Sequence, residues 1–180
     1  LYTSTPGGID IFETSGSSMI SSNDGDVDFD VAGSSSDIIS FASDLSGASN
    51  VYVTDGSVDV SDASYLADLE RGLQNDDADA DVSFIVRDTA AAIVSELAET
   101  NSSIDAADEF SVSFGVTDIS GAQSIQGHSG YNDANSAYDI SDSASAIINN
   151  ASNVYDNGVD DVFVTNPYVD ALEGASLTSI

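Results

Sequence analysis

The fold class is indicated by the segment Phe84-Ile-Val-Arg-Asp-Thr-Ala-Ala-Ala-Ile93, because it joins a short alternating strand to a capped helix. The segment opens with an aromatic residue and β-branched residues in alternation, as a half-buried strand requires. Asp88 and Thr89 then supply side-chain oxygens of the kind that cap helix N-termini. Apolar side chains recur at spacings of three and four through the Ala-rich residues 90–98, which predicts a helix with one buried stripe.

The same pattern occurs three times along the chain, and a second motif falls between the copies. The other copies of the first motif are Phe29-Asp-Val-Ala-Gly-Ser-Ser-Ser-Asp-Ile38 and Tyr138-Asp-Ile-Ser-Asp-Ser-Ala-Ser-Ala-Ile147, so that the starts lie 55 and 54 residues apart. The second motif is Val51-Tyr-Val-Thr-Asp-Gly-Ser-Val-Asp-Val60, Phe110-Ser-Val-Ser-Phe-Gly-Val-Thr-Asp-Ile119 and Val162-Phe-Val-Thr-Asn-Pro-Tyr-Val-Asp-Ala171. Recurrence at a fixed period is the signature of repeat architectures.

We therefore expect an α/β fold in which strand–helix units of about 55 residues stack side by side in a solenoid-like array. The expected boundaries are residues 25–80, 81–134 and 135–180 for three units, with 1–24 as the second half of a preceding unit. Because the pattern starts and stops mid-unit, the chain is expected to be a fragment of a longer one. The alternative is one independent domain whose strands resemble each other by accident.

The charge of the chain is extreme. It has 32 acidic residues, 26 of them Asp, against two arginines (Arg71 and Arg87) and no lysine. A folded chain of 18.4 kDa exposes roughly 8,000 Å², or about 250 Å² per carboxylate. Neighbouring charges then lie about 16 Å apart, and salt screens them over about 8 Å at physiological strength. The fold is therefore expected to belong in a saline or calcium-containing exterior.

The same composition excludes several classes of partner. Nucleic acids and anionic membrane surfaces bind clustered lysine and arginine, which this chain lacks. There is no cysteine, so that disulfides and thiolate metal sites are absent. Membrane insertion is not expected, because no run of 18 apolar residues occurs.

Calcium is the best candidate for chemistry at a site. Residues 23–30 carry carboxylates at every second position, and strand alternation would put them on one face. A bound divalent cation held by oxygen ligands would relieve their repulsion. A second acidic cluster lies at residues 75–81. The predicted ligands are Asp24, Asp26, Asp28 and Asp30 in the first cluster, and Asp76, Asp77, Asp79 and Asp81 in the second. The alternative is that these residues are solvated faces and turns.

Catalytic side chains are scarce. The one histidine, His128, lies in the loop Gly127-His-Ser-Gly130, and no Gly-x-Ser-x-Gly elbow frames a serine. The absence of lysine excludes Schiff-base chemistry. With 32 carboxylates, some pair always lies at a suitable distance for glycoside hydrolysis, so such a pair carries no information. We expect that the chain is not an enzyme.

The motifs Val86-Arg-Asp-Thr-Ala-Ala-Ala-Ile93, Tyr138-Asp-Ile-Ser-Asp-Ser-Ala-Ser-Ala-Ile147 and Val112-Ser-Phe-Gly-Val-Thr-Asp-Ile-Ser-Gly-Ala-Gln123 resemble a known kind of unit. Similar strand–helix repeats occur in very large exported proteins of cyanobacteria and other aquatic bacteria, and the resemblance covers about residues 27–180. It implies surface-layer, motility-related or adhesive work. Gly33 and Ser34 depart from the Asp-Thr pair of the pattern. Calcium is not carried over, because no glycine-rich calcium-binding nonapeptide occurs.

The expected function is therefore structural: a segment of an extracellular surface layer, filament or adhesin, self-assembling or joined to further repeats, and stiffened by calcium. Two alternatives stay open. One is an extracellular binding module that recognises carbohydrate or a cell surface, and the other is a halophilic enzyme fragment whose site uses carboxylates.

Overall fold

The computed structural model describes residues 3–4, 10–13, 29–75, 77–154, 157–166 and 168–178, with the backbone alone at 3–4, 10–13 and 152–154. The chain forms two compact units. Unit 1 comprises residues 1–86 and 105–108, and unit 2 comprises residues 87–104 and 109–180. Predicted repeat boundaries at 25, 81 and 135 divide the chain by sequence motif, and they stay a prediction.

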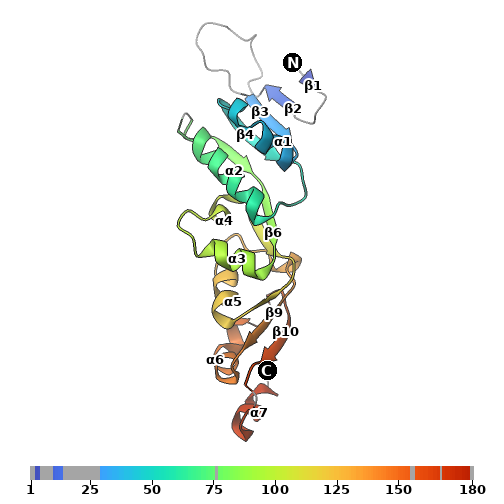
Figure 1. The fold of residues 1–180 in the computed structure, drawn as a ribbon, viewed down its shortest axis with the longest axis vertical. Helices are drawn as coiled ribbons and strands as arrows, with labels where there is room; N and C mark the ends of the chain where they lie inside the picture. The colour runs from blue at the N-terminus through green and yellow to red at the C-terminus, as the bar shows by residue number, and fades with distance from the viewer. Residues whose placement is uncertain are drawn as a thin grey trace. The chain divides into compact units, whose positions relative to one another are not determined.

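Unit 1 holds a five-stranded sheet in the order β1-β2-β3-β4-β5. β1 and β2 pair in antiparallel fashion, as do β2 and β3, whereas β3, β4 and β5 are parallel. Helices α1 and α2 lie side by side against this sheet (Figure 1). The elements are β1 (Thr3–Ser4), β2 (Asp10–Glu13), β3 (Phe29–Gly33), α1 (Ser35–Ser40), the 3₁₀ turn η1 (Ala42–Asp44), β4 (Ala48–Val53), α2 (Val60–Leu73) and β5 (Asp81–Ser83).

Unit 2 contains a parallel three-stranded sheet in the order β10-β9-β8 and a row of helices in which α3, α5, α6 and α7 pack in sequence (Figure 1). β6 (Ile85–Asp88), which runs from unit 1 into unit 2, forms a two-stranded sheet with β7 (Glu109–Val112). The other elements are α3 (Ala90–Leu97), α4 (Ser103–Ala106), β8 (Val116–Thr117), α5 (Ile119–Gln126), the 3₁₀ turn η2 (Asp133–Asn135), β9 (Tyr138–Asp142), α6 (Ala144–Val154), β10 (Val159–Val164) and α7 (Ala171–Leu177).

The fold is therefore mixed α/β with small, largely parallel sheets, as the alternation of strand and helix patterns predicts. Each copy of the first motif forms a strand followed at once by a helix. The third residue of each strand motif and its last isoleucine are buried with at most 1% of their surface exposed: Val31 and Ile38, Val86 and Ile93, and Ile140 and Ile147. These side chains form the core between helix and strand.

Strand register is the same in the parallel pairs that the first and third copies of the motifs form. Val31 pairs with Val51, and Ile140, which has the same place in its motif, pairs with Val162. Both pairs also shift register just after their first residue pair. A one-residue slip would turn every side chain to the opposite face, so register is strongly specified where one face is buried.

Six helices begin at a side chain that accepts a hydrogen bond from the backbone N–H three residues further on. This contact satisfies one of the four N–H groups that a helix start leaves without a helical acceptor. Thr89 was predicted from the sequence as part of such a cap. The capping residues alternate between hydroxyl and carboxylate: Ser34, Asp59, Thr89, Asp118, Ser143 and Asp170.

In each of α1, α3 and α6, the backbone N–H of the first residue also donates a hydrogen bond to an acceptor just after the next strand. The Ser35 N–H donates to Oδ2 of Asp55 at 2.6 Å, and the Ala144 N–H donates to Oδ1 of Asn166 at 2.8 Å. In the middle copy the Ala90 N–H donates to the backbone oxygen of Phe114 at 3.0 Å. The motif therefore closes strand, helix and following strand into one hydrogen-bonded loop.

Candidate functional site

The structure describes four of the eight predicted calcium ligands. Asp30 lies on β3, Asp77 and Asp79 lie in the turn before β5, and Asp81 begins β5. The other four, Asp24, Asp26, Asp28 and Asp76, lie outside the described residues.

Asp30 links two strands. It is half-buried, and its Oδ1 accepts a hydrogen bond from Nδ2 of Asn50 on the paired strand β4 at 2.8 Å. In unit 2, Asp139 at the same place in its motif accepts from the N–H of Asp161 at 3.2 Å. Both carboxylates therefore tie a parallel strand pair together, which is a structural use of the oxygen atoms that calcium would need.

Asp77 shapes the turn that leads into β5. Its Oδ1 accepts from the Asp79 N–H at 3.1 Å, and its backbone oxygen accepts from the Ala80 N–H at 3.0 Å. Such contacts are typical of Asp in turns. Across the described ranges, no three His, Cys, Asp or Glu side chains are grouped so that they could hold a metal ion. Calcium binding at these residues stays a prediction.

Glu70 of α2 is a polar group that the sequence pattern did not single out. Its Oε1 accepts from Nε2 of Gln74 at 2.9 Å, while its Oε2 is buried and has no hydrogen-bond partner within the described part of the chain. Burial, and then the carboxylates of Asp81 and Asp108, raise the pKa of Glu70 against the opposing effect of Gln74 and Arg71. The charged form of Glu70 is therefore disfavoured in the folded state.

Replacing Glu70 with glutamine should raise the melting temperature at pH 7. A folded-state pKa above the unfolded value contributes stability that is present at low pH and is lost as the pH rises through the folded pKa. Glutamine removes this loss, and the gain should stay below about 1 kcal/mol because solvent screens the exposed part of the side chain. Thermal melts between pH 4 and 8 measure it. Glu99→Gln at an exposed position of unit 2 is the control, and equal gains in both variants would contradict the prediction.

A groove of about 460 Å³ lies between the α1–η1 segment and α2 in unit 1. Ile39, Leu69 and Leu73 supply apolar lining, and Tyr65 and Asp68 add polar groups. Tyr65 is 60% exposed, so that its ring is accessible from solvent. An apolar concave surface with a few polar groups is typical of sites for small molecules.

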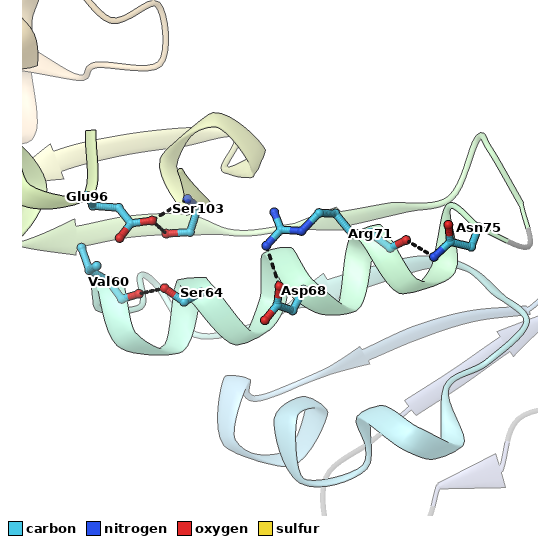
Figure 2. Close-up of polar contacts among 7 residues, drawn as sticks. All are labelled: Val60, Ser64, Asp68, Arg71, Asn75, Glu96 and Ser103. Carbon is cyan, nitrogen blue, oxygen red and sulfur yellow. Dashed lines mark hydrogen bonds and ion pairs between the residues drawn. The ribbon is translucent and has the colours of Figure 1, made fainter. Parts of the chain in front are cut away.

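Asp68 at this groove is paired with one of the two arginines of the chain. Figure 2 shows Arg71 reaching along α2 to Oδ1 of Asp68 at 2.6 Å. Both side chains are largely exposed, so the pair contributes at most about 1 kcal/mol to stability. Its effect is local, because it neutralises the carboxylate at the groove.

Glu96 is another carboxylate with a structural contact. Its Oε1 accepts from both the N–H and the Oγ–H of Ser103, at 2.6 and 2.8 Å (Figure 2). Ser103 is buried and begins α4, so that Glu96 joins two helices of the chain where a turn connects them. Hydrogen bonds to a charged acceptor are stronger than neutral ones.

His128 packs as a ring in unit 2. Its plane stands edge-on to Phe110 with centroids 5.3 Å apart and an interplanar angle of 74°. Its Nδ1 accepts from the Gly130 N–H at 3.2 Å. Phe110 also meets Tyr131 at 5.6 Å. Rather than a solvated loop residue, His128 is therefore part of an aromatic cluster.

No protein-family model matches the chain, and no curated protein matches it in sequence. Among the described residues, no helix has the length and apolar character that crossing a membrane requires.

Proposed function

We propose that this chain is a structural component of an extracellular surface assembly, namely a surface layer, filament or large adhesin, built from strand–helix units of about 55 residues. The observation that carries the proposal is the recurrence of one strand register, at Val31–Val51 and again at Ile140–Val162. A register shared by separate parts of one chain favours copies of a unit over accidental likeness.

The hydrogen bonds that close each unit support the same interpretation. Ser35 and Ala144 donate to side chains at matching positions after the second strand, and Ala90 donates to a backbone oxygen there. Different acceptors thus make the same contact. The acceptor group differs between the copies, whereas its position after the second strand is the same. Repeated units that share one structural constraint are expected to show this pattern.

The acidic composition supports an extracellular, cation-rich setting. Carboxylates on an extended array form a hydrated anionic coat, and divalent cations would reduce their repulsion. The contacts of Asp30 and Asp77 leave further lone pairs on each carboxylate, so structural use does not exclude a bound ion.

Electron microscopy of the native assembly tests the function. Labelling with an antibody against this chain should decorate a periodic layer or filament at the cell surface. Labelling that is confined to dispersed particles with no periodic arrangement would reject the structural role.

Calcium should raise the melting temperature if it stiffens the array. At a concentration 100 times its dissociation constant, an ion that binds only the folded state adds about 2.7 kcal/mol. Differential scanning calorimetry with 5 mM calcium and with excess chelator, at equal ionic strength, measures the shift. Magnesium at the same concentration is the control for general screening, and an equal shift with both ions would contradict a calcium site.

A binding module is the second candidate, and the groove beside Tyr65 favours it. An exposed aromatic ring next to an apolar hollow can stack on the face of a sugar. Binding of a panel of glycans to the chain, lost in Tyr65→Ala and retained in Phe114→Ala, would support this function. Both aromatic side chains are exposed, so neither change should unfold the chain.

A further inference from the structure

β10 and α7 form the last strand–helix segment of the chain. They are more exposed than the corresponding strands and helices of the earlier copies. Val58, Thr117 and Val169 each stand directly before the Asp that caps a helix. Val58 is 5% exposed and pairs with Val86, and Thr117 pairs with Ile140. Val169 is 41% exposed. The position is thus covered by a parallel strand in two cases and is open in the third.

The helix that follows shows the same difference. In α2 and α5 the fourth and seventh residues after the cap are fully buried, namely Ala63 and Leu66, and Ala122 and Ile125. None of the residues of α7, all of which are described, is buried, and Leu172 is 77% exposed.

The second strand of the motif is open as well. β4 pairs on its outer edge with β5, through Val51 and Val82, and Phe110 of β7 bridges to Tyr131. In the order of the described strands of its sheet, β10 stands at the edge with β9 as its neighbour. Phe163 on β10 is 50% exposed. An exposed apolar edge strand is a template for pairing with another chain.

We infer that the β10–α7 face binds a second copy of this chain, whose β3–α1 segment docks there to form a head-to-tail contact. The occupant is indicated by contacts within the chain: the residue before a capping Asp pairs with the third residue of a first motif, as in Val58–Val86 and Thr117–Ile140. The first motif of a second copy has Val31 at that place, where it is paired with Ile11 of β2 in the same copy. The contact would therefore continue an arrangement that the fold already uses twice.

The edge of β3 that faces away from β4 is already paired with β2, in antiparallel fashion, through Ile11 and Val31. Docking of a second copy therefore competes with β2 for the same edge. Since both copies are strongly acidic, association should also strengthen as salt screens their repulsion. This inference rests on the proposed structural role and names the partner and the surface.

Sedimentation velocity over a range of concentrations in 1 M sodium chloride is the first test. The average mass should rise above the 18.4 kDa of one chain. Val169→Asp and Leu172→Asp should each weaken association by about tenfold or more, because each puts a charge into an apolar contact. Phe114→Ser, which alters an exposed aromatic residue outside β3, α1, β10 and α7, should leave association unchanged. A monomer at all concentrations, or association that both aspartate variants retain, would overturn the inference.

Cysteine pairing tests the register directly, since the chain has no cysteine of its own. Val116 pairs with Asp139 inside the chain, and the corresponding residues across the contact are Tyr168 of one copy and Asp30 of the next. Mixing Tyr168→Cys protein with Asp30→Cys protein under mild oxidation should give a disulfide-linked dimer, since adjacent strands lie within disulfide reach. The exposed Asp44→Cys replaces Asp30→Cys in the control mixture, and equal yields from both mixtures would exclude this register.

The two proposals can fail separately. A chain that stays monomeric while micrographs show a periodic array would reject the β10–α7 contact and leave the structural function standing. Association through β10–α7 without any array at the native surface would reject the structural function and leave the β10–α7 contact standing.

Discussion

Replacing Phe110 with alanine should lower the free energy of unfolding by about 3–5 kcal/mol, the usual cost of removing a buried phenylalanine ring. Phe110 is fully buried and meets the rings of His128 and Tyr131. Its backbone N–H and oxygen are bonded to Gly130 and Asn132. The alanine variant would leave a cavity between β7 and that loop.

Urea denaturation followed by circular dichroism measures this loss. Phe114→Ala is a matched control, because Phe114 lies four residues further on and is 64% exposed. It should change stability by less than about 0.5 kcal/mol. A Phe110→Ala variant whose unfolding midpoint equals that of the control would show that the aromatic cluster does not support the unit.

Lowering the sodium chloride concentration from 0.5 M to 10 mM at pH 7 should destabilise the fold by several kcal/mol. Two charges about 16 Å apart repel by about 0.3 kcal/mol in water, and each of the 32 carboxylates has several neighbours. The screening length grows from a few Å at high salt to about 30 Å at 0.01 M, so this repulsion is then barely reduced. Unfolding separates the charges and relieves it.

Thermal melts over this range of salt, with chelator present throughout, measure the effect without divalent ions. The triple variant Asp44→Asn, Asp160→Asn and Asp161→Asn removes three exposed charges and should show a weaker dependence on salt. A variant with the same three sites changed to glutamate keeps the charge and is the control. A melting temperature that does not depend on salt would mean that bound cations or local pairing neutralise the surface.

The strand–helix pattern could be predicted from sequence because its signals are local. Thr89 shows this, since a hydroxyl followed by an Ala-rich apolar stripe specifies where a helix starts, and Thr89 accepts the hydrogen bond that begins α3. Parallel pairing followed from the alternation of short strands with helices. The stacking of the units as one array stays a prediction.

Burial along β7 could not be predicted in the same way. Phe110, Val112 and Phe114 alternate as one strand face, yet the first two are buried and Phe114 is exposed. β7 ends at Val112, and Gly115 has a φ of +112°, a conformation that glycine adopts more readily than other residues. There the chain passes close to the start of α3, so alternation stops before the sequence pattern does.

The predicted calcium ligands illustrate a different difficulty. A carboxylate that accepts an N–H in a turn and a carboxylate that binds calcium use the same oxygen atoms, so residue type and spacing do not distinguish them. Asp77 accepts such a hydrogen bond in a turn, and Asp30 accepts one from the side-chain amide of Asn50 on the neighbouring strand. Glu70 was not predicted, because the burial of its oxygen results from packing around α2. The sequence next to Glu70 does not indicate that packing.

The hydrogen bonds that close each unit have a consequence for how the chain folds. Ser35 reaches its acceptor 20 residues away, Ala144 reaches its own 22 residues away, and Ile119 reaches Asp142 at 23 residues. Closing loops of this length costs little entropy compared with contacts between distant parts of a chain. Folding can then proceed in short steps as the polypeptide emerges during synthesis, and each completed step offers a strand edge on which the following segment can form.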